Sequence, residues 1–234
     1  MKRPYVICHM MSTVDGKILS ANWGDQQMLK QFTGLFEQYH ETFESQAWMC
    51  GRVTMEKDFS KGTKPELIKP AQPIKREAFV GDSNATSFAI AVDGKGKLGW
   101  NENTTGGDHI IEILTGQATD EYIYYLQRKK ISYIFAGEKE VDFTSALQQL
   151  ASIFPIKTIM LEGGGHINGS LLNDGLIDEL SLLVLPIADG TPKSPTVFEV
   201  NEYLQKKPAS VMKLTQVKEV ENGVLWLRYA FENK

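Results

Sequence analysis

Seven apolar runs along the chain predict buried β-strands. Each run is four to nine residues long and is bounded by turn-forming residues, which is typical of strands rather than helices. They cover residues 5–12, 47–50, 87–92, 109–115, 132–137, 157–161 and 179–187. Because apolar runs without alternation suit strands covered on both faces, the pattern predicts an α/β fold with a mostly parallel central sheet flanked by helices.

Helical spacing of apolar residues fills four of the segments between these runs. The predicted helices cover residues 25 to about 45, 119–130, 142–154 and 167–173. At the C-terminus, two further apolar stretches, 211–220 and 224–231, flank Asn222-Gly223, a pair typical of a β-hairpin turn. The expected sheet is therefore mixed, with an antiparallel hairpin at the C-terminus.

Two segments rich in Gly, Pro and Lys predict long loops, at residues 60–81 and 93–107. Loops of this length either take part in function or are solvated excursions, and the sequence leaves both open. Neither resembles a linker, so we expect a single domain over residues 1–234. The helix at 25–45 carries apolar residues on overlapping faces, and any surplus apolar area there could form a dimer interface.

Composition narrows the class of protein. Of the 234 residues 42% are hydrophobic and 23% are charged, and the net charge of −4 gives no basic surface for nucleic acid. No apolar run reaches the roughly 18 residues that a bilayer span needs, and the N-terminus lacks a secretory signal. We therefore expect a cytoplasmic protein without nucleic-acid or membrane partners. Cys8 and Cys50 lie in strand-like runs and are interpreted as buried thiols.

The stretch MLEGGGHINGSLLNDG, residues 160–175, places three glycines between a predicted strand and a predicted helix. A helix N-terminus offers unpaired N–H groups, and glycine lets an anion approach the backbone. The order therefore favours a phosphate or dinucleotide over a simple tight turn. It is not the Rossmann fingerprint, because the turn comes late in the chain and Asn168 stands where that pattern needs its third glycine.

Two other strand ends carry polar residues. In AWMCGRVTMEKDF, residues 47–59, a glycine is followed by a short helical segment that carries Arg52 and Thr54 in its first turn. Arg52 suits a phosphate, although an ordinary turn with a surface arginine fits equally well. In MMSTVDGKIL, residues 10–19, Asp15 and Lys17 follow the first strand, at the end where open α/β sheets bind ligands.

These three stretches together resemble the reductase domain of riboflavin biosynthesis, the C-terminal half of the bifunctional deaminase-reductase family. The motifs are STVDGKI, GRVTMEKDF and MLEGGGHINGSLL followed by GLIDELSLLVLPIADG, and they extend over nearly the whole chain. The resemblance implies a dihydrofolate reductase-like fold, a dimer and NADPH-dependent reduction of a pyrimidine ribosylamine phosphate. The zinc pattern of the deaminase half is absent from this sequence, so a reductase standing alone is expected.

The resemblance also assigns roles to residues. Asp15, Lys17 and Glu162 would lie at the reacting centre, and Arg52 would bind the 2′-phosphate of NADPH. The remaining cofactor-binding residues would be Thr54, Asp58, Thr115, Gly163, Gly164, Gly165, His166, Ile167, Asn168, Gly169 and Ser170.

The implied chemistry is hydride transfer from the nicotinamide to the imine carbon of a ring-opened ribosylamine, so that catalysis is chiefly orientation. A carboxylate such as Glu162 or Asp15 would assist ring opening or proton balance; alternatively, Glu162 only caps the following helix. The family's phosphate-binding arginines are missing. The helix at 25–45 carries Glu37, Glu41 and Glu44 instead, and the later loop offers only Lys61 and Lys64.

Two other functions stay open. One is a dihydrofolate reductase-like enzyme that reduces a pterin or another small imine or carbonyl, and the other is a dinucleotide-binding module without turnover. The four histidines show no metal-binding spacing, so no metal is expected. Trp23 and Trp100 lie in polar loops, where each either stacks on a ligand ring or packs over its loop.

Overall fold

The computed structural model describes residues 2–24, 26–202, 204 and 207–232. Its contacts divide the chain into two compact units, Ser45–Ile159 with residues 2–4, and Tyr5–Glu44 with the residues from Met160 onward. Each unit is described by itself. The single domain expected over residues 1–234 stays a prediction.

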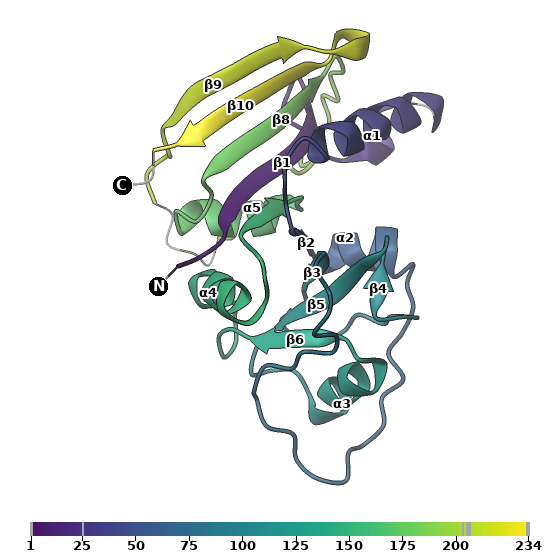
Figure 1. Cartoon of the computed structure of the whole chain (residues 1–234). Coiled ribbons are helices and arrows are strands. Elements are labelled where there is room, and N and C mark those ends of the chain that lie inside the picture. The colour runs from purple at the N-terminus through teal and green to yellow at the C-terminus, as the bar shows by residue number, and fades with distance from the viewer. Residues whose placement is uncertain (1, 25, 203, 205–206, 233–234) are drawn as a thin grey trace. The chain divides into compact units, whose positions relative to one another are not determined.

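Four strands form the sheet of the second unit, in the order β1 (Tyr5–Thr13), β8 (Glu179–Leu185), β10 (Leu225–Phe231) and β9 (Met212–Glu219) (Figure 1). β1 and β8 are parallel, whereas β10 is antiparallel to both β8 and β9. The turn between β9 and β10 is η3 (Glu221–Gly223), in which Asn222 and Gly223 have φ of 59° and 72°. Positive φ at both residues is what an Asn-Gly hairpin requires, so the predicted hairpin is confirmed.

Helix α1 (Gln26–His40) packs on one face of this sheet (Figure 1). Tyr39 contacts the indole of Trp226 on β10, with ring centroids 4.4 Å apart. The predicted helix was too long at its C-terminal end, because both the amide and the hydroxyl of Thr42 donate to the Tyr39 carbonyl and turn the chain away. Its predicted start, Asp25, lies outside the described residues. A short 3₁₀ turn, η1 (Ser20–Asn22), precedes it.

The first unit contains a parallel sheet of β2 (Ala47–Gly51), β3 (Phe88–Val92), β5 (Asp108–Leu114) and β6 (Ser132–Phe135). β4 (Thr104–Thr105) adds an antiparallel pair beside β5; the sequence did not predict it, because two residues carry no periodicity. α3 (Asp120–Lys129) and α4 (Phe143–Ile153) begin at Thr119 and Asp142, whose side chains accept from backbone amides of the first turn.

Helical elements follow the ends of two strands. α2 (Arg52–Thr54) and the π-helical turn η2 (Met55–Phe59) come directly after β2, as the short helical segment that the sequence predicts. β7 (Thr158–Leu161) stands where the two units divide, and α5 (Gly165–Asn173) follows it. The strand pairings confirm the predicted mixed, mostly parallel sheet with an antiparallel C-terminal hairpin.

Candidate active site

The glycine turn after β7 leads into α5 as the sequence predicts. Gly163 has φ of +94°, and the peptide bond between Gly163 and Gly164 is cis. A Cβ on Gly164 would meet no atom within 4 Å, so this glycine faces open space. The N-terminus of α5 begins at the next residue, and its first N–H groups lack partners within the helix. This end of α5 can therefore accept an anion beside Gly164.

Two further glycines, Gly165 at the start of α5 and Gly169 within it, are required by packing within the second unit. A Cβ on Gly165 would lie 2.4 Å from the Thr196 carbonyl oxygen, and one on Gly169 would lie 2.2 Å from that of Glu199. Both distances are far shorter than any real contact. Gly165 and Gly169 thus let the segment 196–200 lie directly against α5, which explains them without a ligand.

The polar side chains of α5 differ in what they face. Asn168 is fully buried and donates from Nδ2 to the Val197 carbonyl, whereas its Oδ1 has no hydrogen-bond partner among the described residues. The Ser170 hydroxyl donates to the carbonyl of His166, one turn earlier. Ile167 is half-buried and His166 is exposed. Of these predicted cofactor residues, only His166 presents an exposed polar side chain.

Asp15 and Lys17 hold the segment that follows β8. Asp15 accepts from the Thr13 hydroxyl at 2.6 Å and from the amides of Asp189 and Gly190. These hydrogen bonds, that of Thr13 foremost, lower the pKa of Asp15 to about 2. Lys17 Nζ donates to the Ser194 carbonyl at 3.2 Å. The structure therefore brings both residues together with the segment 189–194.

Glu162, the residue between β7 and the glycines, is paired. Its Oε1 lies 2.5 Å from Nδ1 of His40, the last residue of α1. The two side chains are 12% and 21% exposed, so the pair is only partly screened by water. The sequence analysis missed His40, since it is 122 positions away from its partner and no local signal connects them.

In the first unit, Arg52 donates to Glu56 at 2.6 Å, and Lys64 donates to the other oxygen of that carboxylate at 2.8 Å. The two cations, that of Lys64 first, lower the pKa of Glu56. Thr54, the last residue of α2, is half-buried, and Asp58 of η2 is exposed. Glu56 was missed, although its spacing of four residues from Arg52 is the spacing of a helical ion pair.

Thr115 is almost fully buried and joins two loops of the first unit. Its hydroxyl donates to the Gly94 carbonyl at 2.7 Å, and its backbone amide donates to the same oxygen at 2.9 Å. This side chain therefore positions the turn that follows β3.

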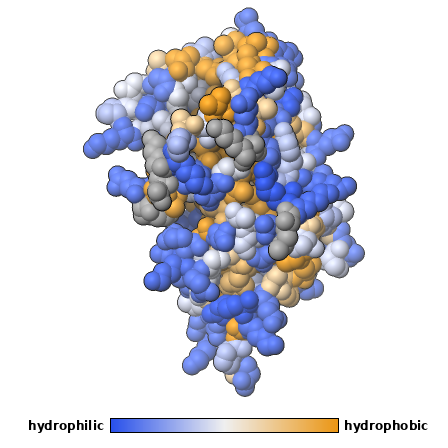
Figure 2. Space-filling model, turned by 90° about the vertical axis from the view of Figure 1, so that its left-hand side faces the viewer, coloured by the Kyte–Doolittle hydropathy of each residue, from blue (hydrophilic) through white to orange (hydrophobic). Residues whose placement is uncertain are grey.

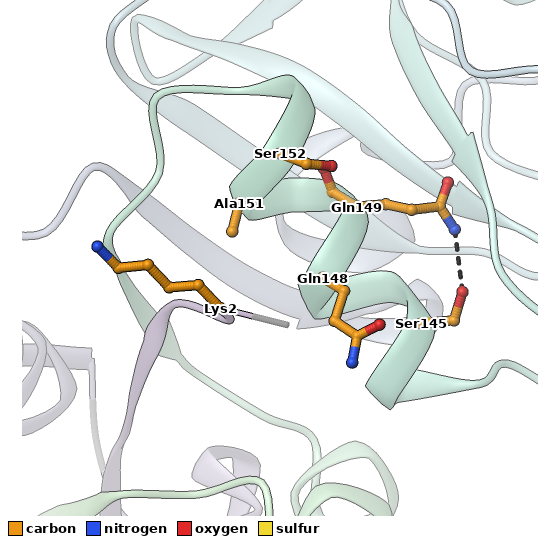
Figure 3. Close-up of a pocket in the computed structure, with 6 residues that line it drawn as sticks. All are labelled: Lys2, Ser145, Gln148, Gln149, Ala151 and Ser152. Carbon is orange, nitrogen blue, oxygen red and sulfur yellow. Dashed lines mark hydrogen bonds between the residues drawn. The ribbon is translucent and has the colours of Figure 1, made fainter.

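Two of the surface hollows formed by the described residues lie in the first unit, and neither of these two contains a predicted site residue. The first, of about 350 Å³, is lined by Lys2 and by polar residues of α4 such as Gln148 and Gln149 (Figure 3). The second, of about 240 Å³, is lined by Phe59 and Ser60, which follow Asp58, and by residues from Trp100 to Thr105.

Trp100 is 4% exposed and its indole donates to Glu112, so it packs inside its loop; Trp23, 2% exposed, belongs to the core cluster of the second unit.

Across the described ranges, no three His, Cys, Asp or Glu side chains gather in a way that could hold a metal ion. No helix in those ranges is long and apolar enough to cross a membrane. The cytoplasmic location stays a prediction.

Comparison with known proteins gives one family over nearly the whole chain. Residues 4–226 match the family model of the RibD C-terminal domain. Two relatives are named 2,5-diamino-6-ribosylamino-4(3H)-pyrimidinone 5′-phosphate reductase. That of Archaeoglobus fulgidus is 24% identical over 87% of this chain and 90% of its own, and that of Methanothermobacter thermautotrophicus is 26% identical over 84% of each.

Solved structures give the same fold. A pyrimidine reductase-like protein of Corynebacterium diphtheriae aligns with a TM-score of 0.65 at 16% identity, over 99% of this chain and 93% of its own. The riboflavin biosynthesis reductase of Saccharomyces cerevisiae aligns at 0.60 and 15% identity, over 98% and 90%. The dihydrofolate reductase-like fold expected from the sequence is thereby confirmed. The chain belongs to the RibD C-terminal domain family.

Proposed function

We propose that this protein is an NADPH-dependent reductase of a pyrimidine ribosylamine phosphate, either 5-amino-6-(5-phosphoribosylamino)uracil or its diaminopyrimidine counterpart. The names of the relatives and the family support the reductase activity and the substrate class. The observation that carries the proposal is the open Gly164 at the N-terminus of α5, two residues after Glu162 in the chain. An anion-accepting turn beside an acidic side chain suits a dinucleotide and a reacting substrate.

The residues present fit such a cofactor. The Gly163–Gly164 turn and the first amides of α5 would bind its phosphates, with exposed His166 beside them. Asn168, Gly169 and Ser170 would act through the shape of α5, because they are buried. In the first unit, Thr54 and Asp58 would contact the cofactor, Thr115 would position a neighbouring turn, and Arg52 would bind the 2′-phosphate that distinguishes NADPH from NADH.

The chemistry that the nicotinamide supplies is hydride transfer to the imine carbon of the ring-opened substrate. The protein orients the substrate and keeps the proton balance. Glu162 is the carboxylate available for the proton step. Asp15, bound to two backbone amides and a hydroxyl, holds the segment 189–194 rather than exchanging protons, and Lys17 holds the same segment.

The phosphate of the substrate would be bound by lysines. Lys61 is exposed in the loop that follows η2, and Lys64 of the same loop already lies against Glu56. Lysine binds phosphate as a point charge, with less geometric selection than arginine. We therefore propose that the protein discriminates only weakly between substrates with and without the phosphate.

We also propose a homodimer formed through one face of the β8–β10–β9 sheet. On this face, opposite α1, lie the apolar side chains of Met212, Leu214 and Val217 on β9, and of Leu225, Leu227, Tyr229 and Phe231 on β10. Leu214 is 50% and Val217 is 60% exposed. Figure 2 shows that apolar residues, in orange, lie among the polar ones on the surface of the upper part of the molecule. An apolar face suits a two-fold contact, because each copy presents the same surface to the other.

The test is a thermal shift of the purified protein with NADPH and with NADH, followed by nicotinamide absorbance after the ribosylaminopyrimidine phosphate is added. A ligand at 100 times its dissociation constant stabilises by about 2.7 kcal/mol, which is easily measured. We expect NADPH to raise the melting temperature and then to be oxidised. Oxidation of NADPH with a pterin instead would make the pterin the substrate. Binding of NADPH without its oxidation in the presence of either compound would contradict a reductase.

A further inference from the structure

The pair formed by His40 and Glu162 connects the end of a helix to the residue before the glycine turn. An ionised carboxylate only accepts hydrogen bonds, so Nδ1 of His40 carries the hydrogen that lies on Glu162 Oε1, over 2.5 Å. His40 is the last residue of α1, where the helix dipole favours a donor or a cation. The three glycines that follow Glu162 have no side chains that could hold its carboxylate.

The ring of His40 has a neighbouring histidine, His9, that is itself fixed by hydrogen bonds. The ring of His9 lies edge-on to that of His40, with centroids 6.3 Å apart, and stacks on Phe36 at 4.3 Å. Its Nε2 donates to the Phe36 carbonyl, and its Nδ1 accepts from the Ser181 hydroxyl. Burial lowers the pKa of His9 to about 4, so this ring is neutral near pH 7. His9 therefore offers a rigid, uncharged surface against which His40 is oriented.

We infer that His40 is a positioning residue that holds the Glu162 carboxylate at the reacting centre through its Nδ1–H. The inference rests on the proposed function, because it needs Glu162 to face the substrate. It goes beyond that function by making the orientation of the acidic group depend on a side chain from α1. Without this donor the carboxylate loses the hydrogen bond to its Oε1, and an error of about 1 Å at a reacting group costs about 100-fold in rate.

Two substitutions of His40 separate the hydrogen bond from packing. His40→Asn keeps an N–H donor near the position of Nδ1, whereas His40→Phe keeps a ring against His9 and removes the donor. Glu41→Gln, at the next and exposed position, is the matched control for a change at the end of α1. For each full-length variant, kcat and KM are measured with NADPH and the ribosylaminopyrimidine phosphate, and the dissociation constant of NADPH is measured separately.

We expect His40→Phe to lower kcat about 100-fold while NADPH binding changes less than about twofold, and His40→Asn to recover at least tenfold of the loss. Full activity in His40→Phe, or equal losses in two variants that melt like the wild type, would overturn the positioning role alone. If the wild type itself does not oxidise NADPH with this substrate, the proposed function fails and the positioning role fails with it.

A second measurement needs no substrate. In protein labelled with ¹⁵N-histidine, the Nδ1 signal of His40 should move in Glu162→Gln, while that of His109, which belongs to the first unit, stays in place. This comparison decides the case if His40→Phe does not fold. An unchanged His40 signal would show that the pair does not exist in solution and would overturn the inference.

Discussion

Glu112 illustrates at the scale of one residue how burial fixes a protonation state. The carboxyl group has no exposed surface; Oε1 accepts from the indole of Trp100 at 2.6 Å, and both oxygens lie 2.9 Å from the Tyr122 hydroxyl. That hydroxyl also lies 2.8 Å from the Leu98 carbonyl and has one hydrogen to donate. The contacts of 2.6 to 2.9 Å are all satisfied if Glu112 is protonated and donates to Tyr122, which donates to Leu98. The longer contact of 3.4 Å between the Tyr122 hydroxyl and Asp93 then carries no hydrogen. Burial, followed by the nearby charge of Asp93, raises the pKa of Glu112 well above its usual value.

This protonation state predicts a pH dependence of stability. Glu112 keeps its proton in the folded protein but loses it in the unfolded chain above about pH 4.5, so its contribution to the free energy of unfolding is lost as the pH rises towards the folded pKa. Glu112→Gln has no proton to lose. We expect urea denaturation between pH 5 and pH 9 to show a shallower decline for Glu112→Gln than for the wild type. The exposed Glu102→Gln, in the loop that carries Trp100, should keep the wild-type slope; identical slopes in all three would contradict a protonated Glu112.

At the scale of elements, the sequence predicts what is local. Apolar runs locate the strands because burial on both faces requires them, and the caps Thr119 and Asp142 begin their helices as expected. Errors lie at ends, such as the last turn of α1, where Thr42 competes for a backbone carbonyl. In the candidate site, too, the sequence predicts the local features and misses the contacts between distant segments. The motifs locate the glycine turn and Arg52, but the partner His40 comes from a distant segment, and the packing role of Gly165 depends on a carbonyl of Thr196.

The turn after β2 gives a prediction about the cofactor. Arg52 is held by Glu56, so a 2′-phosphate would share or replace that carboxylate. We expect Arg52→Ala to weaken NADPH at least tenfold and NADH much less, because a hydrogen bond to a charged group contributes about 1.5–3 kcal/mol. Glu56→Gln should tighten NADPH severalfold, since it releases both Arg52 and Lys64 from their counter-ion. Titration calorimetry measures both, with the exposed Lys57→Ala as the control. Equal losses of NADPH and NADH in Arg52→Ala would contradict the 2′-phosphate role.

At the scale of the whole molecule, the uncovered sheet face is the feature that one chain does not explain. In the second unit, β9 is the last strand of the order β1–β8–β10–β9, and its partly exposed apolar residues line up with those of β10 across the hairpin. A dimer interface in any surplus apolar area of the helix at 25–45 stays a prediction, and Phe32, Leu35 and Tyr39 of α1 are buried against the opposite face of this sheet. The apolar surplus therefore lies on the strands.

A charge placed on this face should separate the copies. We expect Leu214→Glu and Val217→Glu to convert a dimer into a monomer in sedimentation velocity, because a two-fold contact brings the new carboxylate close to its own copy in a desolvated interface. Lys213→Glu is the matched control, since Lys213 is also exposed but pairs with Ala230 on the face that α1 covers. Both strand variants should melt near the wild-type temperature at low protein concentration, where the wild type is also dissociated. A dimer that survives both substitutions, or one that Lys213→Glu breaks equally, would move the interface to another surface, and a monomeric wild type would remove the dimer from the proposal.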